Sequence, residues 1–215
     1  MKAQLATLSI SIISIFVATS QATLAEDAAP AKIAVGDKWV YQETDNITKS
    51  PTRTITWVVT ETADKTYTIT ANTSKDQHNV DLYDYNGNGV EYNDVTYAPN
   101  DGTGLPPGAK PGTTWKQSYT WRNSQKGNGG KARADGKCDS NEQVTTPAGT
   151  FDTLKCTVTL DIGATTGGVK EREIVQTSWY SPKTLRPVQR EVVNKEHGHL
   201  ASDVTQQLTE YHLGD

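Results

Sequence analysis

Apolar side chains alternate with polar ones along most of the chain, and this period of two restricts the fold more than any other feature. The segment 52–61 places Ile55, Trp57 and Val59 on one side and threonines on the other. Such alternation is typical of β-strands that bury one face. Threonine occurs 31 times, and its branched side chain favours strands over helices. The sequence therefore predicts an all-β protein.

Predicted strands recur between clusters of Gly, Pro, Asn and Asp, and no segment after residue 25 has a capped helical stripe. Besides the two arms of one hairpin that contains both cysteines, they cover 38–44, 52–61, 66–72, 79–85, 90–97, 114–122, 170–180, 187–194 and 204–213. The short connections predict an antiparallel meander of about ten or eleven strands. Because so long a sheet must curl, close or split, we expect a curved sheet or half-barrel, with a β-sandwich or a closed barrel as alternatives.

The first 25 residues have the organisation of an export signal. Lys2 precedes an apolar stretch over residues 5–17, and Thr23-Leu24-Ala25 fits a signal-peptidase site, with Ser20-Gln21-Ala22 as a second candidate. The stretch is too short and too rich in serine to span a bilayer comfortably. We therefore predict a signal peptide at 1–25, a flexible leader at 26–35 and a single β domain at 36–215. The protein is expected to be exported, either periplasmic or secreted.

Composition excludes several classes of partner. Removal of the signal leaves 20 basic residues against 25 acidic ones, and this mild negative balance argues against nucleic acid and against anionic lipid surfaces. No cysteine lies near the cleavage point, so a lipid anchor is not expected. No later segment is apolar enough for stable membrane insertion, and no motif calls for a cofactor.

The two cysteines of an exported chain are expected to form a disulfide. Cys138 and Cys156 are equally spaced about Pro147, which sits in the turn signal Pro147-Ala148-Gly149. Opposed residues of an antiparallel hairpin have a constant index sum, so the two cysteines are expected to face each other. The same register places Glu142 opposite Asp152, which predicts a bulge or solvent exposure near the turn.

Two stretches resemble metal sites and are better explained as turns. Asp84, Asn86, Asn88 and Gly89 occupy calcium-loop positions, but Val95 stands where the bidentate carboxylate is needed, and flanking helices are missing. The Asn-Gly pairs favour a tight turn between strands. His197-Gly198-His199 lacks a third ligand and is expected to be an exposed hairpin tip. No metal site is predicted.

Trp115, Tyr119 and Trp121 share one face of a predicted strand and form the candidate binding face. Aromatic faces can stack sugars or line an apolar groove, although the same three residues would also serve as hydrophobic core. We expect the loops at 100–112 and 124–137 to rim a groove in this concave sheet.

Four segments, taken in order, resemble a known group of proteins. They are Gly36–Tyr41 (GDKWVY), Pro111–Trp115 (PGTTW), Val144–Leu154 (VTTPAGTFDTL) and Thr177–Pro182 (TSWYSP). The set is similar to the TapB-like group of exported bacterial proteins of unknown function. The resemblance implies an exported all-β domain and supplies no catalytic residues. The chain departs from the pattern in the loop at 126–137 and in Thr184-Leu185-Arg186-Pro187, where a glycine-rich turn would be expected.

These observations predict a non-catalytic β domain of the cell envelope that binds an unidentified ligand or protein partner. One alternative is a hydrolase of envelope polymers that uses dispersed carboxylates such as Asp161, Glu171 and Glu173, which need no local motif. Another is a structural or assembly protein that pairs through an exposed sheet edge. No catalytic residue is predicted for the first reading.

Overall fold

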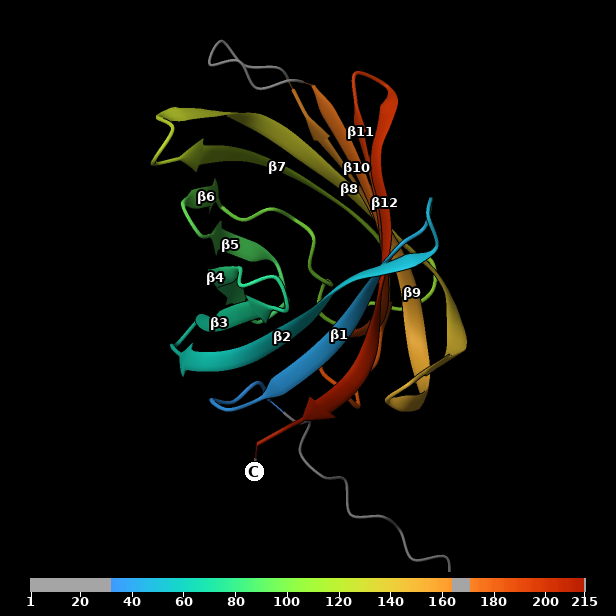
Figure 1. The fold of residues 1–215 in the computed structure, drawn as a ribbon. Helices are drawn as coiled ribbons and strands as arrows, with labels where there is room; N and C mark the ends of the chain where they lie inside the picture. The colour runs from blue at the N-terminus through green and yellow to red at the C-terminus, as the bar shows by residue number, and fades with distance from the viewer. Residues whose placement is uncertain (1–31, 164–170, 215) are drawn as a thin grey trace, which may run out of the picture. The chain divides into compact units, whose positions relative to one another are not determined.

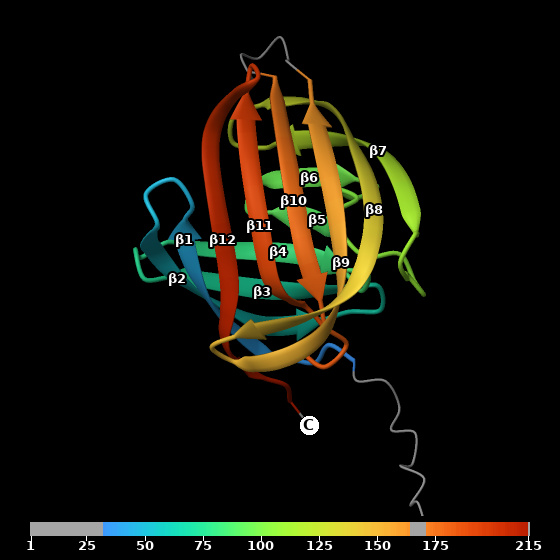
Figure 2. The same ribbon diagram turned by 90° about the vertical axis from the view of Figure 1, so that its right-hand side faces the viewer.

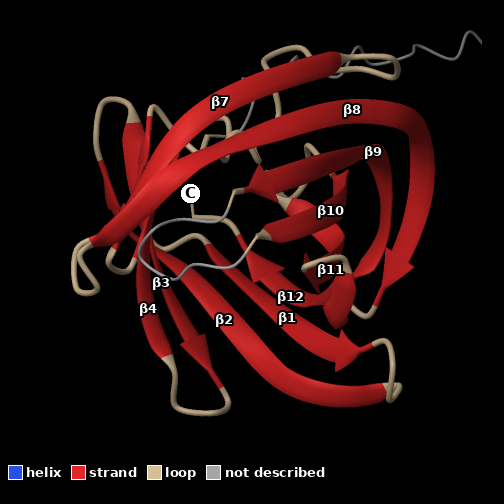
Figure 3. Ribbon diagram, turned by 90° about the horizontal axis from the view of Figure 1, so that it is seen from above, coloured by secondary structure: helices blue, strands red, loops and turns tan. Residues whose placement is uncertain are grey.

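A computed structural model describes residues 32–163 and 171–214 of the chain. The predicted signal peptide and most of the leader lie outside these residues. The described part forms one closed antiparallel barrel of twelve strands (Figure 1). It contains no helix (Figure 3), and therefore none that is long and apolar enough to span a membrane.

The strands follow one another around the barrel in chain order, and the last pairs with the first. They are β1 (Lys38–Asp45), β2 (Ser50–Thr62), β3 (Thr66–Thr73), β4 (His78–Asp84), β5 (Gly89–Tyr92), β6 (Val95–Ala98), β7 (Thr114–Asn123), β8 (Asn128–Thr146), β9 (Gly149–Ile162), β10 (Arg172–Tyr180), β11 (Pro187–Glu196) and β12 (His199–His212).

The predicted all-β antiparallel meander is confirmed, but the half-barrel of ten or eleven strands is wrong. The closed-barrel alternative is correct because β1 pairs with β12, from Lys38 opposite His212 to Asp45 opposite Val204. The twelfth strand arises because the predicted strand 90–97 is divided. Asn93 adopts a left-handed backbone with φ of 50°, and a tight turn there places Tyr92 opposite Val95.

The predicted loop at 124–137 is another correction, because most of it belongs to β8. Residues 128–137 pair with β7, and Ala132 and Ala134 are buried. The glycines in this segment meet close neighbours. A Cβ atom on Gly136 would lie 2.1 Å from the Trp115 ring, and one on Gly129 would lie 2.5 Å from the Trp121 carbonyl oxygen. Glycine here permits close packing between strands.

The β8–β9 hairpin joins Cys138 to Cys156 by a disulfide, and the two residues are direct cross-strand partners. A register shift between Cys138 and Ser140 moves the rest of the hairpin by one position. Glu142 consequently opposes Thr153, and Asp152 opposes Gln143. The irregularity therefore avoids the pairing of two carboxylates that the uninterrupted register would impose.

The end of this hairpin folds back across the end of the barrel where β1 begins and β12 ends (Figure 2). Phe151 is 3% exposed and lies edge-on to the Tyr211 ring, with 5.9 Å between the ring centroids. The Ala148 amide donates a hydrogen bond of 3.3 Å to the Leu208 carbonyl. The turn between β8 and β9 is thus held against β12.

The loop between β6 and β7 fills part of the interior. Residues 101–104 of this loop are buried. A Cβ atom on Gly102 would lie 2.7 Å from Cβ of Gln117 on β7 and 2.8 Å from Cβ of Ala134 on β8. A barrel of this strand number encloses more space than inward side chains fill. We refer to residues 101–104 as the interior plug.

The core has two clusters. The larger contains inward residues of β1 to β4 together with Phe151, Trp179, Val188 and Leu208, and includes Ile55, Trp57 and Val59, which the alternation places on one face. The smaller lies on β7, β8 and β9 and contains Tyr119, Ala132, Ala134, Val158 and Leu160.

Removal of the disulfide tests how strongly the hairpin contributes to stability. Replacement of both Cys138 and Cys156 by alanine opens a loop with a sequence separation of 18 residues. In the chain-entropy description this costs about 3 kcal/mol of unfolding free energy. Urea denaturation of the double variant and the oxidised parent measures the difference. A loss below about 1 kcal/mol would contradict this stabilising role.

Candidate functional site

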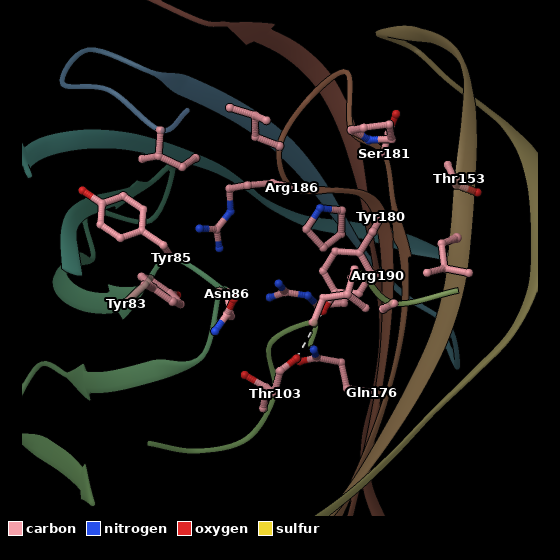
Figure 4. A pocket seen from close by; sticks show the side chains of 18 of the residues that line it. Tyr83, Tyr85, Asn86, Thr103, Thr153, Gln176, Tyr180, Ser181, Arg186 and Arg190 are labelled. Carbon is pink, nitrogen blue, oxygen red and sulfur yellow. Dashed lines mark hydrogen bonds between the residues drawn. The ribbon is translucent and has the colours of Figure 1, made fainter. Parts of the chain in front are cut away.

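A cavity of about 770 Å³ lies inside the barrel at the end where β4 and β10 end and where β3 and β11 begin. One wall carries tyrosines of β3 to β5 and the loop residues Thr103 and Leu105. The opposite wall comes from β8 to β11 and from the turn at 181–186. Figure 4 shows Arg186 and Arg190 in the space between Tyr83 on the first wall and Tyr180 on the second.

Tyrosines from five consecutive strands form a row of ring contacts that begins at the first wall, where Tyr67, Tyr83 and Tyr92 line the cavity, and continues beyond it. Tyr67 on β3, Tyr83 on β4, Tyr92 on β5, Tyr97 on β6 and Tyr119 on β7 are joined in this order, with centroid distances of 5.7, 5.5, 5.3 and 5.8 Å. The contacts arise because each ring points inward from a neighbouring strand. The row links the large core cluster to the small one.

The interior plug is fixed to this row by a buried carboxylate. Asp101 accepts hydrogen bonds from the Tyr92 hydroxyl at 2.8 Å, from the Gly89 amide at 2.9 Å and from the Thr103 amide and hydroxyl. Burial raises the pKa of Asp101, although these donors act in the opposite direction. On the opposite side, the Tyr180 hydroxyl donates to the Thr103 carbonyl at 3.2 Å. The plug therefore braces both walls of the cavity.

Arg186 has a fully interior position and is 5% exposed. Its guanidinium carbon lies 4.5 Å from the Trp57 ring centroid, 4.8 Å from that of Tyr83 and 5.6 Å from that of Trp39. Its Nη1 donates a hydrogen bond of 2.9 Å to the Tyr67 hydroxyl. These contacts form a neutral aromatic cage, because an aromatic face attracts a cation without carrying a formal charge.

The turn between β10 and β11 holds Arg186 in this position. Leu185 adopts a left-handed backbone with φ of 58°, which a non-glycine residue rarely does. The Thr184 hydroxyl donates to the Arg186 carbonyl at 2.7 Å, and the Trp39 indole donates to the Thr184 carbonyl at 2.8 Å. Thr184 is completely buried. The turn is therefore anchored to β1, and this anchoring positions the Arg186 side chain.

The protein supplies little compensation for the two arginine charges. Within the described residues, neither Arg186 nor Arg190 has a carboxylate in ion-pair contact. The Nε atoms of both are buried and have no hydrogen-bond partner in the described structure. Burial raises the pKa of Tyr83 to about 12 and also raises the pKa of Tyr41 and Tyr67, so these phenols stay neutral. Two guanidinium groups therefore line the cavity without a carboxylate in contact with either of them in the described structure.

Asp81 is the inward carboxyl whose ionisation responds to Arg186. It is 9% exposed, and burial raises its pKa to about 6, while a backbone hydrogen bond from Asn93 and the Arg186 charge act in the opposite direction. Asp81 does not line the cavity. It offsets part of the arginine charge from a distance and forms no ion pair with it in the described structure.

The predicted binding face is placed elsewhere in the barrel. Tyr119 is buried, and Trp115 and Trp121 pack against the small core cluster. The Trp115 indole donates a hydrogen bond of 3.0 Å to the Gly102 carbonyl of the plug. None of the three lines the 770 Å³ cavity. Their use as a binding face stays a prediction, and in this structure they pack the interior.

The calcium-like stretch forms a turn between β4 and β5, as predicted. Asp84 accepts hydrogen bonds from the amides of Asn86 and Asn88 at 2.9 and 3.0 Å, and from the side chains of Asn88 and Asn100. Backbone and side-chain N–H groups therefore donate to this carboxylate. Across the described residues, no three His, Cys, Asp or Glu side chains are arranged to hold a metal ion.

His197 and Gly198 form the tight turn between β11 and β12, also as predicted. His197 has φ of 50° and Gly198 has φ of 77°, which suits a two-residue hairpin turn. His199 is exposed at the start of β12. The pair of imidazoles belongs to a hairpin tip.

The carboxylates of the hydrolase hypothesis lie at the other end of the barrel from the cavity. Asp161 and Glu173 are cross-strand partners on β9 and β10, and with Glu171 they line a surface pocket of about 420 Å³. Asp161 pairs with Arg133 at 3.1 Å and Glu173 pairs with Lys195 at 2.9 Å. Their side chains are 49% and 43% exposed. The arrangement lacks the desolvated acid that such a hydrolase needs.

Sequence reasoning missed Arg186 and Arg190. An arginine in a turn or on a strand is normally exposed, so neither position has a recognisable local signal. The segment 184–187, where the sequence resemblance predicted a glycine-rich turn, contains Arg186 but gave no signal of an inward charge. The predicted loop at 100–112 does contribute, since Thr103, Leu105 and Ala109 line the cavity. The other predicted rim, at 124–137, does not.

Three solved structures share the fold at low sequence identity. A candidate lipoprotein from Parabacteroides distasonis matches with a TM-score of 0.54 and 16% identity, over 84% of this chain and 97% of that one. A candidate exported protein with a YmcC-like fold from Bacteroides fragilis matches with a TM-score of 0.50 and 13% identity, over the same shares. The hypothetical lipoprotein YmcC from Escherichia coli matches with a TM-score of 0.50 and 9% identity, over 81% and 84%.

At these identities the likeness shows the fold alone, and the barrel resembles the YmcC-like fold. A scan against protein-family models found no match, and neither did a search of curated proteins. The resemblance to the TapB-like group therefore stays a prediction.

Replacement of Asp81 by asparagine tests the desolvated interior. The folded state holds the Asp81 proton up to about pH 6, whereas the unfolded chain releases it near 3.8, so stability falls as the pH rises through this window. Asp81→Asn should raise the unfolding free energy at pH 7.5 by about 1–2 kcal/mol, a value discounted for partial solvation, and by almost nothing below pH 4.

Urea denaturation at both pH values measures this difference. Asp64→Asn, at an exposed turn, is the matched control. A gain of equal size at both pH values would show that the effect does not come from ionisation.

Proposed function

We propose that this protein is an exported, non-enzymatic binding protein of the cell envelope, and that it binds a small ligand in the cavity between the tyrosine wall and the turn at 181–186. The observation that carries the proposal is a cavity of about 770 Å³ that the barrel, its plug and its folded-back hairpin together leave unfilled. Ligand sites in proteins commonly have volumes of about 300–1,000 Å³ and mix apolar walls with a few polar groups.

The lining supports binding rather than hydrolysis. The carboxylates at the cavity, Glu142 and Asp152, belong to the β8–β9 hairpin. Glu142 accepts hydrogen bonds from the Trp179 indole at 3.0 Å and from the Ser140 hydroxyl at 2.8 Å, and lies 3.5 Å from the Lys155 ammonium. The Trp179 hydrogen bond holds the pKa of Glu142 below its usual value. A carboxylate in this state is a poor general acid.

Export is supported by two independent observations. The first 25 residues match the pattern of a cleaved signal, and a disulfide joins two strands, which suits an oxidising compartment. The structures with this fold include proteins described as lipoproteins or exported proteins.

Barrel closure weakens the assembly alternative. Each of the twelve strands has a hydrogen-bonded neighbour on both sides. A partner that adds a strand needs an unpaired edge, and the closed barrel offers no complete one. Ligand binding inside the barrel is therefore the better-supported proposal.

The test is a binding screen with a variant that fills the cavity. Gln176→Trp places an indole at a lining position on β10 and should reduce binding of any cavity ligand by at least about tenfold, because displaced volume excludes the ligand. Val80→Trp is the matched control, since Val80 is 47% exposed on β4 and lies outside the lining.

Binding is measured by the fluorescence of N-phenyl-1-naphthylamine and 8-anilinonaphthalene-1-sulfonate with the disulfide-intact protein. We expect at least one probe to bind to the parent and to Val80→Trp with similar affinity, and more weakly to Gln176→Trp. Absence of binding by both probes, or equal binding by the Gln176 variant, would refute a ligand site in the cavity.

A further inference from the structure

Resting on the proposed function, we infer that the ligand is an organic oxyanion with an apolar body, and that its acid group binds to Arg186 and Arg190 while its apolar part lies against the tyrosine wall. The assignment of ligand class comes from four features of the described residues.

The first feature is charge without a partner. Arg186 donates a hydrogen bond to the Tyr67 hydroxyl and also interacts with the Tyr41 hydroxyl, and Arg190 makes no hydrogen bond in the described structure. A guanidinium has five N–H donors in a planar fork that matches the geometry of carboxylate and phosphate. Two such groups at one cavity therefore offer far more donors than the protein itself uses. An incoming oxyanion is the ligand chemistry that would use them.

The second feature is the common position of the two arginines. Both line the cavity, and both guanidinium groups approach the Trp57 ring, at 4.5 Å for Arg186 and 5.4 Å for Arg190. Packing on one indole therefore places two like charges in the same part of the cavity. Like charges repel, so an anion near both lowers the energy of the arrangement.

The third feature is a further donor. The Tyr67 oxygen accepts its hydrogen bond from Arg186, which leaves the Tyr67 hydroxyl proton free to donate. No hydrogen bond donated by Tyr67 occurs in the described structure, and Tyr67 lines the cavity. Burial raises the pKa of this phenol, so the proton is present at neutral pH. Tyr67 can therefore donate to the same acid group.

The fourth feature is the distribution of apolar and acidic groups. Apolar surface at the cavity comes from the rings of Tyr83, Tyr92 and Tyr180 and from Leu105, Leu154 and Leu185. The acidic residue Asp152 is exposed, whereas Arg186 is buried. An inorganic anion would leave this apolar surface empty, and a neutral ligand would leave the arginines unpaired. An acid with an apolar body satisfies both.

The test uses two probes that differ by one acid group. 8-Anilinonaphthalene-1-sulfonate carries a sulfonate that N-phenyl-1-naphthylamine lacks, and their ring systems are otherwise the same. We expect the parent protein to bind the sulfonate probe at least about tenfold more tightly, because a hydrogen bond to a buried charge is worth that factor or more. Near-UV circular dichroism verifies that the protein is native during the titration.

Arginine variants then locate the acid group. Arg186→Gln and Arg190→Gln should each weaken sulfonate binding at least about tenfold and change neutral-probe binding less than threefold. Arg122→Gln is the matched control, because Arg122 is exposed on β7 and lies away from the cavity. If Arg186→Gln does not fold, Arg190→Gln and the comparison of the two probes on the parent decide the outcome.

Displacement of the sulfonate probe distinguishes the sources of the oxyanion. Decanoate and decyl phosphate represent a carboxylate and a phosphate with the same apolar chain, and decanol lacks the acid. Displacement by either acid but not by decanol supports the inference and identifies the preferred group. Equal affinity for both probes, or sulfonate binding that both arginine variants retain, would overturn it. Failure of both probes on the parent would instead refute the ligand cavity itself.

Discussion

Closure of a twelve-stranded sheet creates an interior that strand side chains alone do not fill, and the rest of the structure responds to that constraint. The plug at 101–104 lies between Tyr92 on one side and Gln117 and Ala134 on the other, and Asp101 satisfies buried backbone donors there. The β8–β9 hairpin, fixed by its disulfide, folds over the end of the barrel. The space that neither element occupies is the cavity.

The buried charge of Arg186 destabilises the folded state unless its surroundings compensate for the lost hydration. Removing a charged side chain from water costs several kcal/mol, and in the described structure no counter-ion in direct contact with Arg186 offsets this cost. Three aromatic rings and one phenol surround the guanidinium, and each desolvated cation–π contact contributes about 1–2 kcal/mol. A core built for stability alone would use an apolar side chain at this position. In the proposed function, the anchored turn at 184–186 presents a cation to the ligand.

Sequence reasoning predicted the fold where local patterns determine it. The inward sets of β1 to β3, the turns at 85–88 and 197–198, and the pairing of Cys138 with Cys156 follow from alternation, from Asn-Gly chemistry and from hairpin symmetry. Closure of the barrel could not be predicted from these local patterns. It depends on the pairing of β1 with β12, which are the first and last strands of the domain. The segment 128–137 was predicted to be part of a loop because it is rich in glycine. In the structure it belongs to β8, and its glycines permit close contact with the rings and backbone of β7. Arg186 and Arg190 could not be predicted, since only the closed barrel turns them inward.

Two inward guanidinium groups without a carboxylate in contact define the proposed site, and the most direct measurement observes those groups. Side-chain ¹⁵Nε–¹Hε spectra of the protein, assigned through Arg186→Lys and Arg190→Lys, report on each guanidinium separately. On titration with decanoate, the signals of Arg186 and Arg190 should shift together and saturate, while that of exposed Arg122 stays in place. Signals of Arg186 and Arg190 that remain unchanged while surface arginines respond would contradict the account.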